Sequence, residues 1–526
     1  MLLRKRSFAS SPASAIIATA ALLAGTGQAF AAGSATQTIC APKWVNAAHA
    51  APYTSAIIAN TTLLQAAITS CGAAGTASLP ALVDLKANGS IATAQISSVN
   101  LASNIVIKVE AGFTLLGPTA AQAGYTGTGS SSAPAMLFGK DGNGKAANNV
   151  TLTGTGTIDG NGASWWAIYN QGGVYTAQSR PKFIDFYGSN IRVGANFDNL
   201  GNQVTGVTFP TATNDTTNTL KIKNAPMPHL EFESGSSNTI VDGVWIYAPP
   251  GRANLGTGTM KNVAPNTDGI DIVGVNDTPG HALTSIVQNC VIDVGDDNIA
   301  IKSNKAALAT GATSGSGGAV YNVAVRNCVF GGGHGLSIGG QETGGVYNVT
   351  ATNVHFRGTD FGLKVKTDNT AKDTGIINGV SYANVCMQNV AEPIQLTYLY
   401  AQGASSSALG TPPLIENIVY DNIVATNTSS ATSQKVLLGE VTGSDPSSAK
   451  YTTAVDLISN NIRITNSSIT GPAGTAPFLV TDGTLQIGKN SIVATATGTG
   501  GTVTATLADV GPTVVCPATI TIPAQQ

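Results

Sequence analysis

The chain has 526 residues, of which 10% are charged, 42% are hydrophobic and 61 are glycine. This composition, which is also rich in Thr, Ser, Asn and Val, is typical of short strands joined by tight turns and argues against a helical fold. The formal net charge of −2 excludes capture of a polyanion by the overall field of the protein, so nucleic-acid binding is not expected.

Residues 1–31 have the pattern of a secretory signal peptide. Three basic residues, Arg4 to Arg6, precede an apolar stretch around residues 15–24, and the Ala-Phe-Ala of residues 29–31 fits a small-x-small cleavage site. Its removal lowers the formal net charge from −2 to −5, because the segment carries three positive charges and no negative ones. No later stretch reaches the roughly 18 apolar residues of a membrane span. The sequence therefore predicts a secreted, extracellular protein.

Six cysteines would enter the oxidising compartment of an exported protein, where the sequence does not resolve their pairing. Cys40 and Cys71 are the nearest pair in sequence, and this is the pairing that we favour. Cys290 and Cys328 occur in the matching contexts Gln-Asn-Cys-Val and Arg-Asn-Cys-Val, which indicates small buried residues stacked in a repeat.

From about Asn148 onward, the sequence repeats one phrase. Each copy has an asparagine, alternating apolar residues, a glycine and a second alternating run, as in NNVTLTGTGTIDG, SIVQNCVIDVGDDNIAIKS and YNVAVRNCVFGGGHGLSIGG. Repetition at a period of a few tens of residues is the signature of a solenoid, and the alternation indicates strands. We therefore predict an all-β protein, a single right-handed parallel β-helix (β-solenoid). Residues 32–147 would form its N-terminal part and cap, and residues 148–526 the β-helix with its cleft and C-terminal coils.

One register aligns the second run of four successive copies, because their apolar residues fall at matching positions. Parallel strands stack about 4.8 Å apart, so residues in one column become neighbours although they are distant in sequence. The residues between the apolar columns must point outward, which places Lys364 and Lys366 in solvent on one sheet. The runs are Asp268–Ile272, Asp297–Lys302, His334–Gly339 and Phe361–Lys366, and the inward columns are Ile270, Ile299, Leu336 and Leu363, then Ile272, Ile301, Ile338 and Val365.

Acidic residues gather at the head of these aligned strands. Asp268, Asp297 and His334 occupy one column, with Asp296 beside it. Adjacent residues of a flat strand face opposite sides, so Asp296 and Asp297 can act together only if a turn or bulge occurs there. Repulsion among crowded carboxylates raises one pKa while the others stay charged, which supplies both an acid and a base. The sequence thus predicts a reactive site at this place.

Each of these features has a simpler interpretation when it is taken alone. The Asn-Thr-Asp-Gly run fits an ordinary turn, Asp296 and Asp297 could cap a coil or bind calcium, and His334 between two glycines could be a loop residue. Their convergence with two lysines in one register of a charge-poor chain favours a functional site. Asp271 and Lys302 also point outward in this register, and they have no role in this interpretation beyond solvation or framing of the cleft.

Four motifs occur in order along the aligned strands: Asn-Thr-Asp-Gly at 266–269, Gly-Asp-Asp at 295–297, Gly-His-Gly at 333–335 and Gly-Leu-Lys-Val-Lys-Thr at 362–367. This set resembles the motifs of the polygalacturonases, glycoside hydrolase family 28, of the secreted bacterial type. The resemblance covers about residues 148–400.

The resemblance implies a hydrolase that cleaves α-1,4-galacturonosyl linkages of pectate or pectin with inversion, with endo action favoured. Asp296 would be the general acid, and Asp268 with Asp297 would hold the attacking water. His334 would help to tune the ionisation of the acid. No metal or other cofactor is required. We expect the polysaccharide to be the partner of a monomer, with no nucleic acid and no membrane.

The resemblance also assigns substrate contacts. Lys364 and Lys366 would bind galacturonate carboxylates, and Asn266 would contact the substrate. Tyr400 resembles a family tyrosine at the cleft, although Tyr398 is close enough to serve instead. Lys364 stands where the family has arginine, and lysine lacks the planar fork that grips a carboxylate with two hydrogen bonds. Subsite affinity or preference would therefore be altered.

Three other functions remain open at the level of sequence. Rhamnogalacturonan hydrolysis is the nearest, because it belongs to the same family. A pectate lyase also uses a parallel β-helix with acidic residues, but its chemistry requires Ca²⁺ and a strong base, and its products absorb ultraviolet light. A non-catalytic adhesin can be a Thr-, Gly- and Asn-rich solenoid, yet it gives no reason to concentrate these charges in one column.

Overall fold

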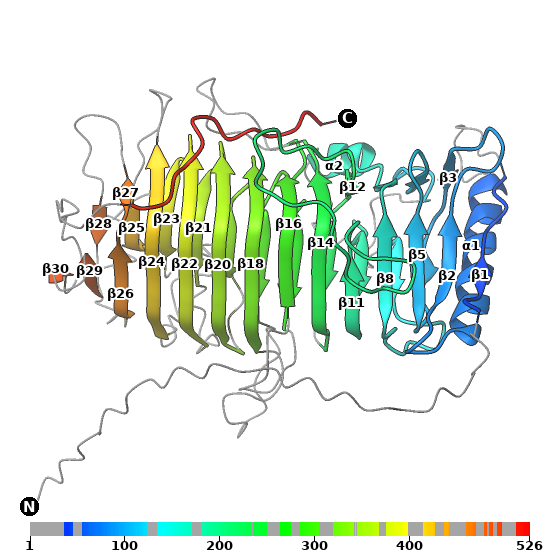
Figure 1. Ribbon diagram of the computed structural model, residues 1–526, viewed down its shortest axis with the longest axis horizontal. Helices are drawn as coiled ribbons and strands as arrows, with labels where there is room; N and C mark the ends of the chain where they lie inside the picture. The colour runs from blue at the N-terminus through cyan, green and yellow to red at the C-terminus, as the bar shows by residue number, and fades with distance from the viewer. Residues whose placement is uncertain are drawn as a thin grey trace, which may run out of the picture. The chain divides into compact units, whose positions relative to one another are not determined.

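Two stacked parallel sheets form the fold of the protein, which we describe from a computed structural model (Figure 1). The structure describes residues 36–525 except 46–54, 124–133, 171–179, 234, 250–262, 275–284, 304–318, 341, 343, 368–374, 398–413, 427–435, 441–458, 470–477, 481–482, 488–491 and 497–511. The predicted signal peptide lies outside the described residues. So do Tyr398 and Tyr400.

Within the described residues, one sheet has 19 strands and the other has 11. The first contains β1 (Ile39–Cys40), β2 (Ala81–Leu85), β3 (Thr93–Gln95), β5 (Ile105–Val109), β6 (Thr114–Leu116), β8 (Val150–Gly154), β9 (Thr157–Asp159), β11 (Ser189–Val193), β12 (Leu220–Lys223), β14 (Ser237–Tyr247), β16 (Ser285–Asp293), β18 (Val320–Gly331), β20 (Val346–Arg357), β22 (Ile376–Gln388), β24 (Leu414–Thr426), β26 (Ser459–Thr465), β27 (Ser468–Ile469), β29 (Gly483–Ile487) and β30 (Ile492–Ala496). The second contains β4 (Val99–Asn100), β7 (Leu137–Gly139), β10 (Ile184–Phe186), β13 (Leu230–Phe232), β15 (Ile270–Val273), β17 (Ile299–Lys302), β19 (Leu336–Gly339), β21 (Phe361–Lys366), β23 (Glu392–Thr397), β25 (Val436–Glu440) and β28 (Phe478–Val480). Two helices, α1 (Ser55–Ala74) and α2 (Ala163–Asn170), accompany them.

The coils contribute strands to both sheets, and these pair in parallel with their equivalents in the neighbouring coil, except that β30 pairs antiparallel with β29. In the 11-stranded sheet, β15 pairs in parallel with β17, β17 with β19, and β19 with β21. Figure 1 shows the long strands of the other sheet side by side from β2 to β26. This is the predicted parallel β-helix. Its coils begin at Ala81, although the repeat can be read in the sequence only from about Asn148.

The predicted inward columns are confirmed. Ile270 pairs with Ile299, Ile299 with Leu336, and Leu336 with Leu363. All four side chains are fully buried. Burial of such aliphatic side chains contributes roughly 1.5–3 kcal/mol each, which makes the register costly to shift.

Asparagines at the corners between coils explain the Asn of each repeat. Asn149, Asn190 and Asn238 have positive φ values of 55°, 58° and 50°. Asparagine tolerates this left-handed conformation better than other residues with a Cβ. The amide of Asn190 donates to Asn149 Oδ1 at 2.8 Å, and Asn238 donates to Asn190 in turn. The same side chain therefore makes the turn and ties it to the preceding coil.

Helix α1 contacts the N-terminal strands β1 to β5, and the sequence did not predict it. Ile57, Leu64 and Ile68 are buried, and Cys71 forms the favoured disulfide with Cys40. By length and composition alone this helix is apolar enough to cross a membrane, which corrects the expectation that no later stretch would be. Its buried face instead belongs to the same hydrophobic core as the first coils.

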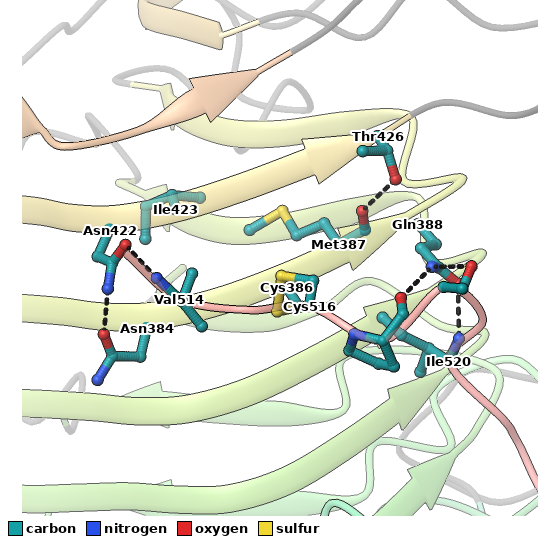
Figure 2. Close-up of a disulfide and its surroundings, with 12 residues drawn as sticks. Asn384, Cys386, Met387, Gln388, Asn422, Ile423, Thr426, Val514, Cys516 and Ile520 are labelled. Carbon is teal, nitrogen blue, oxygen red and sulfur yellow. Dashed lines mark hydrogen bonds between the residues drawn. A yellow bond between two sulfur atoms is a disulfide. The ribbon is translucent and has the colours of Figure 1, made fainter. Parts of the chain in front are cut away.

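The C-terminal tail, residues 512–525, leaves the coils and crosses the outer face of the long strands (Figure 1). A disulfide joins Cys516 to Cys386 in β22, and the Val514 and Ile520 amides donate to the side chains of Asn422 and Gln388 (Figure 2). Under the tail lies an outward column that is buried and mostly apolar, with Trp245, Val291, Val329, His355 and Cys386 in register. The tail therefore acts as a strap, and we use that name for residues 512–525.

Cys290 and Cys328 stack in register between β16 and β18, as the matching contexts indicate. Both are fully buried, and the structure joins them in a disulfide. The stacked positions were predicted, whereas the bond between them was not.

Candidate active site

The predicted site residues converge at the turns that precede β15, β17, β19 and β21. Backbone hydrogen bonds hold these turns one above the other. Gly269 N donates to Asp297 O at 2.9 Å, and His334 N donates to Asp296 O at 2.9 Å. Residues separated by tens of positions in sequence thus occupy a fixed stack, and the carboxylates cannot drift apart without breaking the sheet.

A turn at Asp296 and Asp297 turns both carboxylates to one side, as the sequence required. The Asp297 amide donates to Asp296 Oδ1 at 2.9 Å, and the Asn266 amide donates to Asp296 Oδ2 at 3.2 Å. Gly333, with φ of 77°, lies directly against this turn, and a Cβ there would lie 2.3 Å from Asp296 O. The glycine before His334 is therefore needed for close packing of the two turns.

Asp297 lies in a buried ion pair. Lys366 Nζ is 2.6 Å from its Oδ2, and the Ser337 hydroxyl donates to its Oδ1 at 2.7 Å. Burial on its own raises the pKa of Asp297, but the Lys366 ammonium opposes this, and the pKa is held below its ordinary value. The prediction that Lys366 faces solvent is wrong, because only 4% of it is exposed. The Lys366 side chain points out of the core, but the carboxylate of Asp297, from an earlier coil, covers its ammonium.

Asp268 and Asp271 share one ammonium. Lys302 Nζ lies 3.2 Å from Asp268 Oδ2 and 2.6 Å from Asp271 Oδ2. Burial raises the pKa of both carboxyls above the ordinary value, and repulsion from Asp296 and Asp297 adds to the shift of Asp268. Sequence reasoning gave Asp271 and Lys302 no role. Their opposite charges on adjacent outward positions of neighbouring strands were the available signal.

His334 lies between two carboxylates. Its Nδ1 is 3.2 Å from Asp296 Oδ1, and its Nε2 is 3.4 Å from Asp360 Oδ2. Burial lowers the pKa of His334, but the carboxylates outweigh burial and raise it to about 10. The reverse holds for Asp296, where burial raises the pKa but His334 and Lys366 hold it below its ordinary value. The raised carboxyl pKa values in this cluster thus belong to Asp268 and Asp271, whereas sequence reasoning placed the acid proton on Asp296.

Lys364 also departs from its predicted setting. Only 3% of it is exposed, and its Nζ lies 3.4 Å from the centre of the Phe361 ring. Burial, followed by repulsion from Lys366, lowers the pKa of Lys364 to about 8. The expectation of a solvated strand face is therefore wrong, because an aromatic side chain from the start of the same strand covers the ammonium.

Asn266 has a left-handed backbone, with φ of 58°. Its side-chain oxygen accepts a hydrogen bond from Arg180 Nη2 at 2.7 Å, and Arg180 Nη1 donates to the Pro265 carbonyl at 2.7 Å. Arg180, which is 3% exposed, fixes the loop that carries Asn266 and, two residues later, Asp268. Sequence reasoning missed Arg180 because it lies far from every motif.

Two groups of ligand atoms in the described residues are close enough to surround a cation, with all atoms within 4.8 Å of one another. In each group a lysine already pairs with a carboxylate, Lys366 with Asp297 and Lys182 with Glu231. The second group, Asp185, Glu231 and Glu233, lies on β10, β13 and the residue after β13. Without an ion, the first group offers acid–base chemistry, because the imidazole of His334, whose pKa is raised, contacts the Asp296 carboxylate, whose pKa is lowered.

Comparison with known proteins gives the arrangement a family context. Residues 192–470 match the model of the Glycosyl hydrolases family 28. An endo-polygalacturonase of Pectobacterium carotovorum subsp. carotovorum is 29% identical over 365 residues, which is 66% of this chain and 74% of that protein. An endo-polygalacturonase of Pectobacterium parmentieri is 31% identical over 271 residues, 50% of this chain and 54% of that protein.

Solved structures show the same fold. A polygalacturonase from Erwinia carotovora ssp. carotovora matches with a TM-score of 0.53 and 20% identity, covering 83% of this chain and 96% of that one. A family 28 exopolygalacturonase of Yersinia enterocolitica matches with a TM-score of 0.56 and 16% identity, covering 88% and 79%. At these identities the structures show the parallel β-helix fold and do not identify a particular substrate.

Proposed function

The chain belongs to the glycosyl hydrolases of family 28, and from this membership we propose that it is a polygalacturonase that hydrolyses α-1,4-galacturonosyl linkages of pectate or pectin. We propose endo action and inversion at the anomeric carbon. The observation that carries the proposal is the cluster of Asp268, Asp296 and Asp297 in one stack of turns, with two lysines on β21 of the same sheet.

Inversion requires one carboxyl to protonate the leaving oxygen and another to activate water on the opposite face of the sugar. We assign the acid role to Asp296 and the water to Asp268 and Asp297. Because the pKa of Asp296 is low while that of His334 is about 10, the pair holds one proton at neutral pH, and that proton resides on His334. In the step, the proton on His334 Nδ1 passes to Asp296 across the 3.2 Å contact and from Asp296 to the glycosidic oxygen, which leaves a neutral imidazole and an Asp296 carboxylate.

The substrate assignment is tested with polygalacturonate in the presence of EDTA. We expect new reducing ends without a rise in ultraviolet absorbance, and a fall in viscosity that runs ahead of the reducing ends. Proton NMR of the first product should show the inverted anomer. Loss of activity in EDTA with recovery in Ca²⁺, or a rise in absorbance, would identify a lyase. Cleavage of rhamnogalacturonan in preference to polygalacturonate would identify the protein as a rhamnogalacturonan hydrolase of the same family.

Lys364 is proposed to recognise a galacturonate carboxylate. Lys364→Ala should lower kcat/KM on polygalacturonate by about tenfold or more, since a hydrogen bond to a charged group contributes about 1.5–3 kcal/mol. The loss should shrink on methyl-esterified pectin, whose carboxylates are masked. Lys364→Arg should keep or raise kcat/KM, because the guanidinium offers two aligned donors.

The pKa of Lys364 adds a pH dependence to this prediction. The ammonium is charged below its pKa of about 8 and neutral above it, so KM on polygalacturonate should rise as the pH passes that value. The rise should vanish in Lys364→Arg, because arginine stays charged. An equal, small effect of Lys364→Ala on both polymers would show that Lys364 has only a structural role.

We also propose that the protein is secreted after removal of residues 1–31. The basic, apolar and small-x-small regions of that segment support this proposal. Mass spectrometry of the protein from culture medium should find a first peptide that starts after Ala31. Peptides that contain Arg4 to Arg6 in that material would refute it.

A further inference from the structure

His334 contacts carboxylates that come from two different coils. Asp296 belongs to the turn before β17, and Asp360 belongs to the turn before β21. A neutral imidazole has one N–H and can donate to only one acceptor. Both ring nitrogens of His334 face acceptor oxygens, at 3.2 Å and 3.4 Å, so the arrangement calls for a proton on each of them.

We propose that Asp360 is a positioning residue that holds His334 as an imidazolium, with its Nδ1–H directed at Asp296. The inference rests on the function proposed above, in which Asp296 protonates the leaving oxygen. Asp360 acts through His334 and needs no contact with the substrate. It lies in none of the four motifs as they read in the sequence.

The backbone places Asp360 firmly. Its amide donates to the carbonyl of Gly333 at 2.9 Å, directly before His334, and its own carbonyl accepts from the Glu392 amide at 3.0 Å. The Phe361 ring stands edge to face with the imidazole, with 6.1 Å between the ring centres. The imidazole is therefore fixed at both nitrogens and on one face, which limits rotation away from Asp296.

The charged groups around His334 all bear on its protonation. Asp296, Asp297 and Asp360 favour the imidazolium, and the pKa of His334 is raised to about 10 although burial opposes this. Lys366 pairs with Asp297, and the Lys364 ammonium lies over the Phe361 ring. Without Asp360, Nε2 loses its acceptor, and His334 is free to lose its proton at lower pH.

The first test is an NMR titration of the histidine rings in the full-length protein. Asp360→Asn should lower the pKa of His334 by at least about one unit, the size expected when an opposite charge within hydrogen-bonding range is removed. The His334 resonance is assigned by its loss in His334→Asn. His229 and His355, whose pKa values burial lowers to about 4, serve as internal controls that should not move.

The second test is kinetic. Asp360→Asn should lower kcat on polygalacturonate by at least about tenfold, corresponding to a hydrogen bond to a charged group, and should move the alkaline limb of kcat to lower pH. KM should stay within about twofold. Asp360→Glu, which keeps the charge, should restore part of kcat. Asp215→Asn is the control for the loss of one charge, because it removes an exposed carboxylate that accepts hydrogen bonds from Thr217 in its own turn. It should change neither kcat nor KM.

The two tests separate this proposal from the proposed function. An unchanged His334 titration in a folded Asp360→Asn protein, judged by its thermal midpoint, would overturn the positioning role whatever the substrate is. If Asp360→Asn misfolds, Asp360→Ala carries the titration, and an unchanged His334 pKa in that folded protein would overturn the role as well. If polygalacturonate is not cleaved, the titration still decides the question.

Discussion

Asp296→Asn is expected to lower kcat on polygalacturonate by at least about a hundredfold, the usual contribution of a positioned general acid. The amide keeps the shape of the side chain and can still accept the hydrogen bond from the Asp297 amide, but it has no proton to deliver. It also removes one of the two carboxylates that face His334. The variant should remain folded, and near-normal kcat would refute the assignment.

A substrate with a good leaving group sharpens this experiment. An aryl galacturonide with an acidic phenol departs without protonation, so Asp296→Asn should recover much of its activity there. Asp268→Asn should not, because the water still needs its base. This comparison is needed because the pKa of Asp268 is raised, which makes that carboxyl the alternative proton donor. Recovery in Asp268→Asn and not in Asp296→Asn would exchange the two roles.

Lys302→Met is expected to be the most destabilising of the proposed substitutions. It leaves Asp268 and Asp271, 6% and 3% exposed, without the ammonium that they share. Removal of one partner from a buried ion pair costs about 3–5 kcal/mol. Lys182→Met is the matched control, because Lys182 also bridges carboxylates but is more exposed, 34% against 19% for the side chain. Its thermal midpoint should fall less.

The loss of stability in Lys302→Met should depend on pH with a defined sign. Lys302 has a raised pKa and is charged at every pH below its ordinary 10.5, so its own contribution is constant there. The folded-state pKa values of Asp268 and Asp271 are raised, so both carboxyls take up protons as the pH falls from neutral toward 3.8. Neutral carboxyls need no ammonium, and the difference in thermal midpoint from wild type should shrink. A constant difference between neutral and acidic pH would show that the loss comes from packing.

The parts of the fold that repeat were predictable from the sequence. Ile270, Ile299 and Leu336 recur at one position of one phrase, and stacking then places every neighbouring residue by the period of a strand. The juxtaposition of Asp268, Asp297 and His334 followed from that register alone. Helix α1 and the strap lie outside the repeat, so no register extended to them.

The environment of each charged side chain could not be predicted from the repeat. The alternation of inward and outward residues along a strand predicts that Lys366 points out of the core, but it does not predict that Asp297 covers it. Asp360 lies just before its strand, where alternation gives no direction, and its contact with His334 depends on how two turns stack. Which carboxyl keeps a proton depends on those contacts and not on the order of residues.

The strap changes how the coils at the C-terminal end of the molecule can unfold. In a solenoid each coil touches only its neighbours, so the terminal coils can open one after another from an end. The strap enters after the last coils, yet it is anchored at Cys386 and reaches Arg357 and Asp293, in strands that precede those coils. The disulfide closes a covalent loop of 130 residues in sequence separation that contains β23 to β30. Opening of those coils leaves the strap attached to β22, so the outer face of the long strands stays covered while the C-terminal end unravels.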